Sequence, residues 1–269
     1  MTPTPTSSLF ALSNRTILVT GGVRGLGLSV TVSLLESGAD VVVFDLISPD
    51  HPDSVSDWTA AQAVASAHHT KLSWISLDVT DADAVSSSVN AAFSSARPTH
   101  PVKGLFNSAG IQFLKPATQI APSMFRKVID INLTGSFLMS AAFARSFTGS
   151  GGSVVLVASM SGRVANKGLD CAAYNASKAG VVQLARNLAM EWGDKIRVNT
   201  LSPGYIRTAL TDVLLKQKPE YEKTWLDGSL LGRLSTVDEF RGPAIFLLSD
   251  ASSFMTGADL VVDGGHTAV

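Results

Sequence analysis

Short apolar runs alternate with longer segments of helical periodicity along most of this 269-residue chain. Runs such as Val41-Val42-Val43-Phe44 and Val154-Val155-Leu156-Val157 are apolar at every position. A strand that is apolar on both faces belongs in a parallel sheet that helices cover on both sides. The pattern predicts seven strands, at 16–19, 41–44, 72–77, 102–106, 153–158, 196–201 and 260–262.

Helices are predicted between these strands, at 25–37, 56–67, 82–95, 122–147, 172–192 and 237–248. Gly38 can stop the first helix, and Asp81 can cap the free amides of the third. Strands that alternate with helices define the α/β class. We therefore expect a single Rossmann-type domain, with a doubly wound parallel seven-stranded sheet and helices on both faces.

Two segments depart from this regular pattern. Residues 1–13 are rich in Thr, Ser and Pro and are expected to form a flexible tail, which leaves one domain over 14–269. Residues 208–232 lack regular periodicity but contain apolar side chains. A long segment of this kind is usually a lid or binding loop, so a substrate loop is expected near 204–232.

Composition and charge exclude several classes. Hydrophobic residues make up 45% and charged residues 16%, which argues against a disordered chain. A net charge of -1 without a basic tract argues against a nucleic-acid partner, and no apolar run reaches the ~20 residues that span a bilayer. The single cysteine, Cys171, suits a reducing compartment, and the histidine spacing suggests no metal site. A cytoplasmic protein without membrane contact is expected.

A glycine-rich turn, Thr20-Gly21-Gly22-Val23-Arg24-Gly25-Leu26-Gly27, joins the first strand to the first long helix. Glycines allow a tight turn and close approach of the backbone to a diphosphate, and the helix directs its free N–H groups at that anion. The candidate cofactor-binding residues of this turn are Gly21, Arg24, Gly25, Leu26 and Gly27.

Asp45 ends the second strand, 18 residues after Gly27. A carboxylate at this position of a Rossmann unit binds the adenosine ribose hydroxyls and repels a 2′-phosphate. Alternatively, Asp45 only caps a turn, and Arg24 could pair with a 2′-phosphate. The sequence indicates NAD(P), with NAD favoured over NADP because of Asp45.

Other strand ends carry further candidates for the cofactor site. The third strand is followed by Asp78 and Val79, where the adenine edge would lie, and the fourth by Asn107, Ala109 and Gly110. Small residues let the chain pass beneath a flat cofactor. Tight packing at a strand end explains the same residues.

The densest chemistry lies between Ser159 and Lys178. Ser159 follows the fifth strand, and Tyr174 and Lys178 are four residues apart, so they share one helical face. A free tyrosine has a pKa of about 10, which a nearby ammonium would lower toward neutrality. Ser159 can hydrogen-bond a substrate oxygen on which negative charge develops.

These residues together resemble the short-chain dehydrogenase/reductase family over about residues 9–265. The motifs are Thr20-Gly21-x-x-x-Gly25-x-Gly27, Asn107-x-Ala109-Gly110, Asn132, Ser159, Tyr174-x-x-x-Lys178, Pro203-Gly204 and Asp263-Gly264-Gly265. The resemblance implies that Tyr174 is the general acid/base, that Ser159 orients the carbonyl, that Lys178 lowers the tyrosine pKa and that Asn132 holds a relay water. It also places cofactor contacts at Tyr174, Lys178, Pro203, Gly204, Ile206 and Thr208.

Two departures from the family pattern concern Ser108, where a second Asn is usual, and the distance from Ser159 to Tyr174, which is two residues longer than usual. Ser161 has the common spacing, but Ser159 ends the apolar strand, so Ser159 is preferred. The longer loop is similar to that of fungal polyol and ketose reductases of the arabinitol, mannitol or sorbose type. The expected substrate-binding residues are Ser159, Met160, Leu169, Tyr205, Leu210 and Trp225, and this largely apolar lining suits a hydrophobic secondary-metabolite carbonyl instead.

The leading hypothesis is an NAD(P)-dependent oxidoreductase that interconverts a secondary alcohol and a ketone. The alternatives are a lyase or cyclase that uses the same acid/base pair, and a nucleotide-binding module without redox chemistry. Helices 122–147 and 172–192 are too apolar for fully wetted outer faces. Either both are buried in one chain, or, as the resemblance implies, they pair copies into a homotetramer (or homodimer).

Overall fold

The computed structural model describes residues 4–208, 211–212, 215–216 and 218–268. Seven strands form one parallel sheet in the order β3-β2-β1-β4-β5-β6-β7. Their bounds are β1 Thr16–Thr20, β2 Asp40–Asp45, β3 Leu72–Ser76, β4 Val102–Asn107, β5 Gly152–Val157, β6 Ile196–Pro203 and β7 Asp259–Val262. The chain order reverses between β1 and β4, which confirms the predicted doubly wound Rossmann-type sheet.

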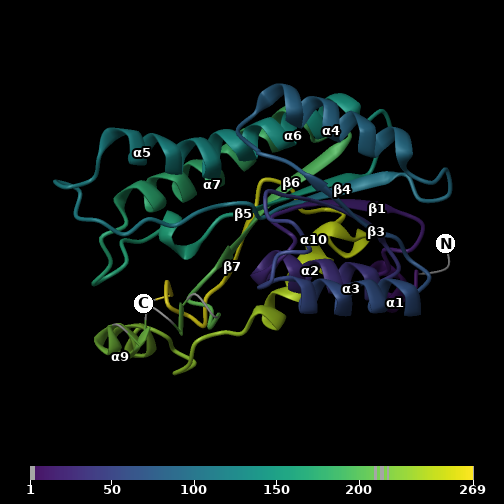
Figure 1. The fold of residues 1–269 in the computed structure, drawn as a ribbon. Helices are drawn as coiled ribbons and strands as arrows, with labels where there is room; N and C mark the ends of the chain where they lie inside the picture. The colour runs from purple at the N-terminus through teal and green to yellow at the C-terminus, as the bar shows by residue number, and fades with distance from the viewer. Residues whose placement is uncertain (1–3, 209–210, 213–214, 217, 269) are drawn as a thin grey trace.

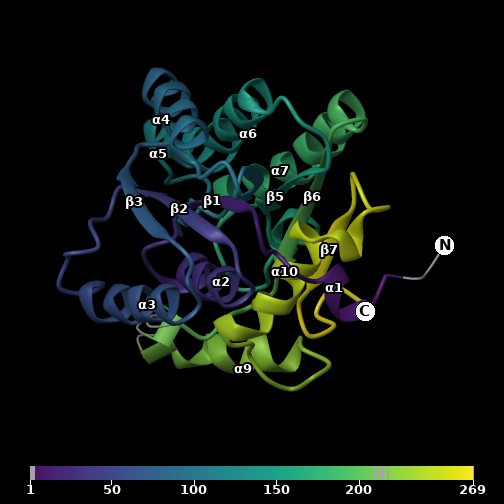
Figure 2. The same cartoon turned by 90° about the vertical axis from the view of Figure 1, so that its right-hand side faces the viewer.

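Helices cover both faces of the sheet (Figures 1 and 2). One face carries α2 Gly25–Glu36, α3 Val55–Ala67 and α10 Arg241–Leu248, and the other carries α4 Ala82–Ser95, α5 Pro122–Ile129, α6 Gly135–Ser146 and α7 Ala172–Trp192. The predicted end signals are confirmed: Gly38 has φ +87°, and the Asp81 carboxylate accepts hydrogen bonds from the amides of Asp83 and Ala84.

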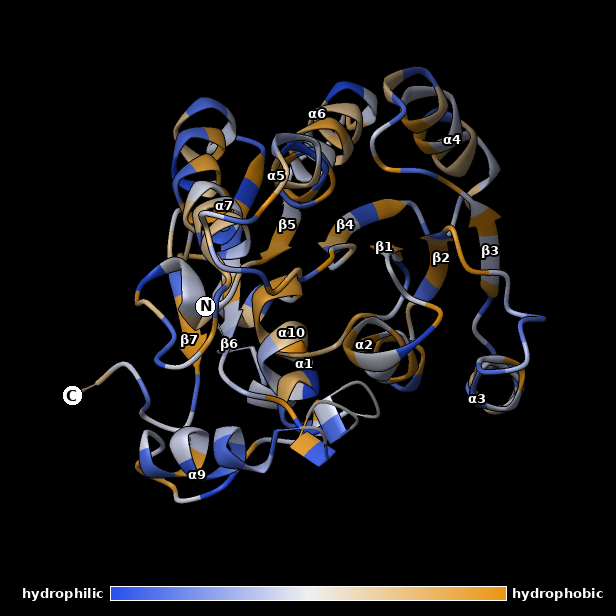
Figure 3. Ribbon diagram, turned by 60° about the vertical axis from the view of Figure 1, so that its left-hand side comes forward, coloured by the Kyte–Doolittle hydropathy of each residue, from blue (hydrophilic) through white to orange (hydrophobic). Residues whose placement is uncertain are grey.

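The sheet separates two hydrophobic cores (Figure 3). Along β5, Val154 and Leu156 enter the core beneath α6 and α7, whereas Val155 and Val157 enter the core on the α2 side. Alternate residues of a strand point to opposite faces, so a strand between two cores must be apolar throughout. This is the physical reason for the uninterrupted apolar runs of the sequence.

The structure corrects three expectations about single elements. The helix predicted at 122–147 is interrupted by a π-helical turn, η1 Asp130–Thr134, and the helix predicted at 237–248 begins as a 3-10 turn, η3 Val237–Phe240. The segment 208–232 is not irregular throughout, because it contains helix α9 Pro219–Asp227. None of the helices in the described ranges is long and apolar enough to cross a membrane.

The segment 1–13, expected as a flexible tail, includes a short helix, α1 Thr6–Leu9. Leu12 is fully buried, and its amide donates a hydrogen bond to the carbonyl of Ser37. The ring of Phe10 lies 6.4 Å from that of Phe246 in α10. The last residues of this segment therefore pack on the domain.

Candidate active site

The glycine turn after β1 has a backbone that requires glycine. Gly21 and Gly25 have φ values of +67° and +58°, and a Cβ on Gly27 would lie 2.0 Å from the carbonyl oxygen of Gly21. Within the described residues, Arg24 makes no side-chain hydrogen bond to the first turn of α2, and that turn has no acidic residue. The amides of this helix end are therefore available to an anion, unlike those of α4.

Asp45 lies against this turn. One carboxylate oxygen accepts a hydrogen bond of 3.1 Å from the Val23 amide, and the other accepts one of 3.0 Å from the Ile47 amide. Asp45 therefore caps a turn and also lies beside the glycine turn, so the two interpretations of this residue do not exclude each other. Asp78, two residues after the end of β3, accepts hydrogen bonds of 2.9 and 2.7 Å from the amide and hydroxyl of Thr80, so it also caps a turn.

Hydrogen bonds join the ends of β1 and β4. The Thr20 hydroxyl donates to Asn107 Oδ1 and accepts a 3.0 Å hydrogen bond from the Ala109 amide. Ser108 donates to the Thr20 carbonyl at 2.6 Å. Asn107 Nδ2 is buried and has no acceptor among the described residues. This unpaired donor and the glycine cradle fit a dinucleotide bound across the crevice between β1 and β4.

The side chain of Asn132 joins the segment 107–111 to the helix α7. This residue is fully buried in the π-helical turn η1. Its side chain accepts a 2.8 Å hydrogen bond from the Ile111 amide and donates to the Ile111 carbonyl at 2.9 Å and to the Ser177 hydroxyl at 3.0 Å. A Cβ on Gly110 would lie 3.1 Å from Asn132 Oδ1 and 3.6 Å from Lys178 Nζ, so these three residues adjoin.

Val79, which follows Asp78, contacts the helix that follows this turn. The side chain of Val79 is buried, and a Cβ on Gly135 would lie 2.7 Å from its Cγ2 atom. Val79 is therefore packed against the start of α6, which accounts for its burial without any ligand.

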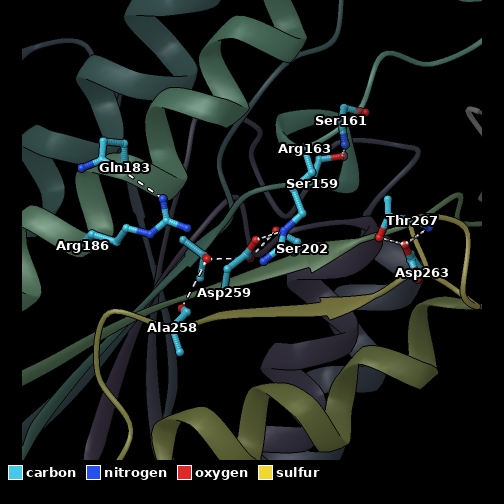
Figure 4. Close-up of polar contacts among 11 residues, drawn as sticks. Ser159, Ser161, Arg163, Gln183, Arg186, Ser202, Ala258, Asp259, Asp263 and Thr267 are labelled. Carbon is cyan, nitrogen blue, oxygen red and sulfur yellow. Dashed lines mark hydrogen bonds and ion pairs between the residues drawn. The ribbon is translucent and has the colours of Figure 1, made fainter. Parts of the chain in front are cut away.

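Ser159 follows β5 and caps a 3-10 turn, η2 Met160–Gly162. Its hydroxyl accepts a 3.1 Å hydrogen bond from the Ser161 amide (Figure 4). A Cβ on Gly162 would lie 2.8 Å from the backbone carbon of Lys178, so only glycine allows the turn to lie this close to α7. This packing brings the Ser159 hydroxyl near enough to the Tyr174 phenol to lower the pKa of the phenol.

The electrostatics of Tyr174 depend first on burial. Burial raises the pKa of the phenol, and the hydrogen bond from Ser159 opposes that rise. Lys178 Nζ lies 5.6 Å from the centre of the Tyr174 ring, and burial lowers the pKa of this amine to about 8. In the chain alone, desolvation dominates the pKa of both groups, and the role of Lys178 in lowering the Tyr174 pKa stays a prediction.

The segment after β6 places the remaining candidates. Pro203 ends β6, and a Cβ on Gly204 would lie 2.7 Å from the Cα atom of Asp263, so two chain segments pass closely here. Ile206 pairs with Ser235 in an isolated parallel bridge. The Thr208 amide donates a 2.7 Å hydrogen bond to the Thr211 hydroxyl. The predicted contact Leu210 lies outside the described residues.

Aromatic side chains gather in the segments that follow β6 and β7. The Tyr205 ring stacks on Trp225 of α9 at 4.2 Å with an angle of 8°, and the His266 ring meets Tyr205 edge-on at 5.3 Å. A cavity of about 70 Å³ lies beside these rings. Met160 is buried, whereas Leu169 is partly exposed.

Asn166 is a site residue that the sequence interpretation missed. It is buried in the loop between Arg163 and Cys171, and its amide donates a 3.1 Å hydrogen bond to the Tyr205 hydroxyl. Its carbonyl oxygen accepts a hydrogen bond of 3.1 Å from Asn175. The extra length of this loop was the only signal, because nothing local distinguishes a buried Asn from a solvated one.

Comparison with known proteins identifies the family. The family model described as "Enoyl-(Acyl carrier protein) reductase" matches residues 21–267. A protein of Aspergillus versicolor named "Short chain dehydrogenases/reductase notP'" is 52% identical across 97% of this chain and 89% of the relative. The chain belongs to the short-chain dehydrogenase/reductase family. These enzymes are NAD(P)-dependent oxidoreductases, which agrees with the dinucleotide crevice.

Other members of the short-chain dehydrogenase/reductase family have more informative names. A D-arabinitol 2-dehydrogenase (ribulose-forming) of Candida tropicalis is 36% identical across 96% of this chain and 94% of the relative. A crystal structure of a gluconate 5-dehydrogenase from Burkholderia cenocepacia, in complex with NADP and tartrate, superposes with a TM-score of 0.86 at 28% identity, over 98% of this chain and 99% of that one. The resemblance to polyol reductases is thereby confirmed.

Family members differ in the cofactor that their names give. An NADP-dependent mannitol dehydrogenase of Hypocrea jecorina is 33% identical across 98% of both chains, and an NADH-dependent L-xylulose reductase of Ambrosiozyma monospora is 34% identical across 96% of this chain and 97% of the relative. Family membership thus establishes NAD(P) without choosing the form. Among the described residues, no group of three or more His, Cys, Asp or Glu could hold a metal ion.

Proposed function

We propose that this enzyme interconverts a secondary alcohol and a ketone, with Tyr174 exchanging the hydroxyl proton. The observation that carries the proposal is that Tyr174 lies beside Ser159, with Lys178 Nζ 5.6 Å from the centre of its ring and the glycine turn at the same edge of the sheet. Acid/base exchange at an alcohol oxygen needs such a phenol with a second hydrogen-bonding group beside it.

Each residue of this group has a separate role in the proposal. Ser159 holds the substrate oxygen next to the phenol, and Lys178 provides a cation near Tyr174. Asn132 fixes the segment that follows Gly110 and so shapes the floor of the crevice. The chemistry that bound NAD(P) supplies is hydride transfer.

For the substrate, we propose a hydrophobic carbonyl compound rather than a polyol. The stacked rings of Tyr205 and Trp225 offer a flat aromatic surface, and Met160 is buried in the turn that follows Ser159. The side-chain amide of Asn166, which donates to the Tyr205 hydroxyl, also accepts a hydrogen bond from Asn175. A sugar hydroxyl that binds Asn166 would have to break these bonds, whereas the stacked rings suit a flat ring or an alkyl group. Because several relatives are named as polyol dehydrogenases, a ketose is the alternative substrate to be tested.

For the cofactor, we propose NAD, bound by the predicted turn and strand-end residues, with Asp45 at the adenosine ribose. The Asp45 carboxylate is anchored by the amides of Val23 and Ile47, so it cannot swing away without losing both hydrogen bonds. A fixed negative charge beside the glycine turn would repel a 2′-phosphate. Arg24, at the start of α2, is the residue that would favour NADP instead.

For assembly, we propose a homotetramer (or homodimer) formed through the outer faces of α6 and α7. A groove between these helices is lined by apolar residues, among them Phe137 and Leu184, and by charged residues such as Arg145 and Glu191, and Phe137 is 45% exposed. Light scattering after size-exclusion chromatography would test this, and Phe137→Glu should release smaller species.

A reducing, cytoplasmic location is proposed because the single cysteine, Cys171, is a buried free thiol.

The decisive experiment is Tyr174→Phe, assayed with NAD and NADP against a panel of hydrophobic ketones, ketoses and polyols. Turnover should fall by at least about 10³-fold, while the cofactor Kd, measured by quenching of protein fluorescence, stays within twofold. Product mass shows a change of two hydrogens for redox chemistry and none for a lyase or cyclase. Near-normal turnover of Tyr174→Phe would contradict the mechanism.

A further inference from the structure

A carboxylate at the edge of the sheet is buried beside the Ser159 turn. The side chain of Asp259, the first residue of β7, is only 2% exposed. Its Oδ2 atom accepts a 2.6 Å hydrogen bond from Arg163 Nε, and its Oδ1 atom accepts hydrogen bonds of 2.7 and 2.6 Å from the hydroxyls of Thr200 and Ser202 in β6 (Figure 4).

Arg163 is the residue on which the Ser159 turn ends. The Arg163 amide donates a 2.8 Å hydrogen bond to the Met160 carbonyl, and the Gly162 amide donates one of 2.9 Å to the Ser159 carbonyl. The first residue of the turn follows β5, and Gly162, within the turn, packs against the backbone of α7. The ion pair with Asp259 therefore ties the far end of the turn to β7.

Stability alone does not explain why an ion pair, rather than an apolar pair, occupies this place. Burial of a carboxylate costs free energy that one partly exposed guanidinium repays poorly, and an apolar pair would often serve an edge strand as well or better. The Arg163 side chain is 43% exposed, so its own charge remains hydrated. The three hydrogen bonds to this buried carboxylate are, however, directional. They restrict the position of the end of the turn more than apolar packing would.

We propose that Arg163 and Asp259 are positioning residues, which hold the Ser159 turn so that the serine hydroxyl stays against the Tyr174 phenol. This inference rests on the proposed function of Tyr174 and Ser159. Neither residue of the pair touches the phenol through any hydrogen bond in the described part of the chain. They act through the turn, and the quantity they control is the geometry between two hydroxyl groups.

The Tyr174 phenol reports this geometry. The groups that face it are Ser159 from the turn, Cys171 from the loop before α7, and Lys178 from α7 itself. Burial and Cys171 raise the phenol pKa, and Ser159 lowers it. A turn that moves Ser159 away must therefore raise the Tyr174 pKa.

Asp259→Asn separates positioning from simple electrostatics. Removal of a negative charge, with Arg163 left uncompensated, would by itself lower the pKa of a nearby phenol. Loss of the Ser159 hydrogen bond would raise it. The tyrosinate absorbance of Asp259→Asn is titrated with and without Tyr174→Phe, so that the difference isolates Tyr174 among the three tyrosines. This measurement needs no substrate.

The matched control is Asp40→Asn. Asp40 in β2 is also a buried carboxylate, 5% exposed, paired with the partly exposed Arg97, but four strands separate β2 from β7 in the sheet. Both variants should lose comparable thermal stability. Arg163→Lys, which keeps the positive charge, should recover part of the activity that Arg163→Met loses.

We expect Asp259→Asn and Arg163→Met to raise the Tyr174 pKa and to lower kcat by roughly 10- to 100-fold, with the cofactor KM within twofold. The pH midpoint of alcohol oxidation should move upward with the phenol pKa, and Asp40→Asn should change neither. An unchanged or lowered Tyr174 pKa in Asp259→Asn would overturn the positioning role. If Tyr174→Phe retained turnover, the proposed function would fail, while the titration would still decide the role of the pair.

Discussion

Lys178 Nζ donates a 2.7 Å hydrogen bond to the carbonyl of Val157, the last residue of β5. The amine is thereby tied to the strand that leads into the Ser159 turn, and only 5% of the residue is exposed. Burial lowers the pKa of Lys178 to about 8. A cation held in this way lies near Tyr174 at neutral pH, but its desolvation has a cost in folding free energy.

We predict that Lys178→Met abolishes most turnover and yet changes stability in a pH-dependent manner. Between pH 8 and 10.5, the unfolded chain binds a proton at Lys178 that the folded chain does not, so the stability of the native protein rises relative to the variant as pH rises. The difference amounts to about 3 kcal/mol at most, from a shift of roughly two and a half pKa units. Urea unfolding of both proteins at pH 7 and pH 10.5 measures it.

Other lysines and tyrosines also titrate in this pH range, but their contributions to the free energy of unfolding are the same in both proteins and cancel in the difference. Lys103→Met is the control, because Lys103 lies on the surface and bonds to the Ser150 carbonyl. A stability difference between wild type and Lys178→Met that stays constant over this pH range would contradict the lowered pKa of the buried amine.

Ser159 and Ser161 give a second prediction, which concerns the choice of catalytic serine. Ser159→Ala should reduce kcat by about 10²- to 10³-fold, because the hydrogen bond to the phenol and to the substrate oxygen is lost. Ser161→Ala should retain most activity, because Ser161 contributes its backbone amide to the turn. Steady-state kinetics with saturating cofactor compares them, and the reverse ranking would transfer the role to Ser161.

The architecture could be read from the sequence because it depends on local pattern. A strand between two cores is apolar at every position, as in Val154-Val155-Leu156-Val157, and a helix cap such as Asp81 acts on amides two and three residues away. Helix α9 was missed because its apolar face reduces to one buried residue, Trp225, amid charged neighbours.

The features that escaped prediction depend on tertiary contacts. The sign of the Tyr174 pKa shift follows from burial, which sequence spacing does not reveal. The Asn132 side chain binds the Ile111 amide, 21 positions earlier, and Arg163 and Asp259 are 96 positions apart. Nothing in the local pattern around either residue indicates the other.

The glycine turn gives a third prediction. Gly27→Ala should weaken NAD(P) binding by at least about tenfold, because the new Cβ would lie 2.0 Å from the Gly21 carbonyl oxygen and must displace the turn. Gly242→Ala is the control: it lies in α10, it is exposed, and its Cβ would meet nothing within 4 Å. This change should stabilise the fold by at most about 1 kcal/mol and leave the cofactor Kd unchanged. Equal cofactor affinity in Gly27→Ala and wild type would argue against the turn as the diphosphate site.

The fourth prediction concerns the choice between NAD and NADP. Asp45→Asn keeps an oxygen that can accept the hydrogen bond from the Val23 amide but removes the negative charge. The ratio of kcat/KM for NADP to that for NAD should rise by roughly tenfold or more, since a repulsion on the order of 1–4 kcal/mol between carboxylate and 2′-phosphate is removed. Arg24→Ala in the same background should reverse much of the gain, if the guanidinium then pairs with the phosphate. Competition assays with both cofactors measure the ratio, and an unchanged ratio in Asp45→Asn would place the determinant of cofactor choice elsewhere.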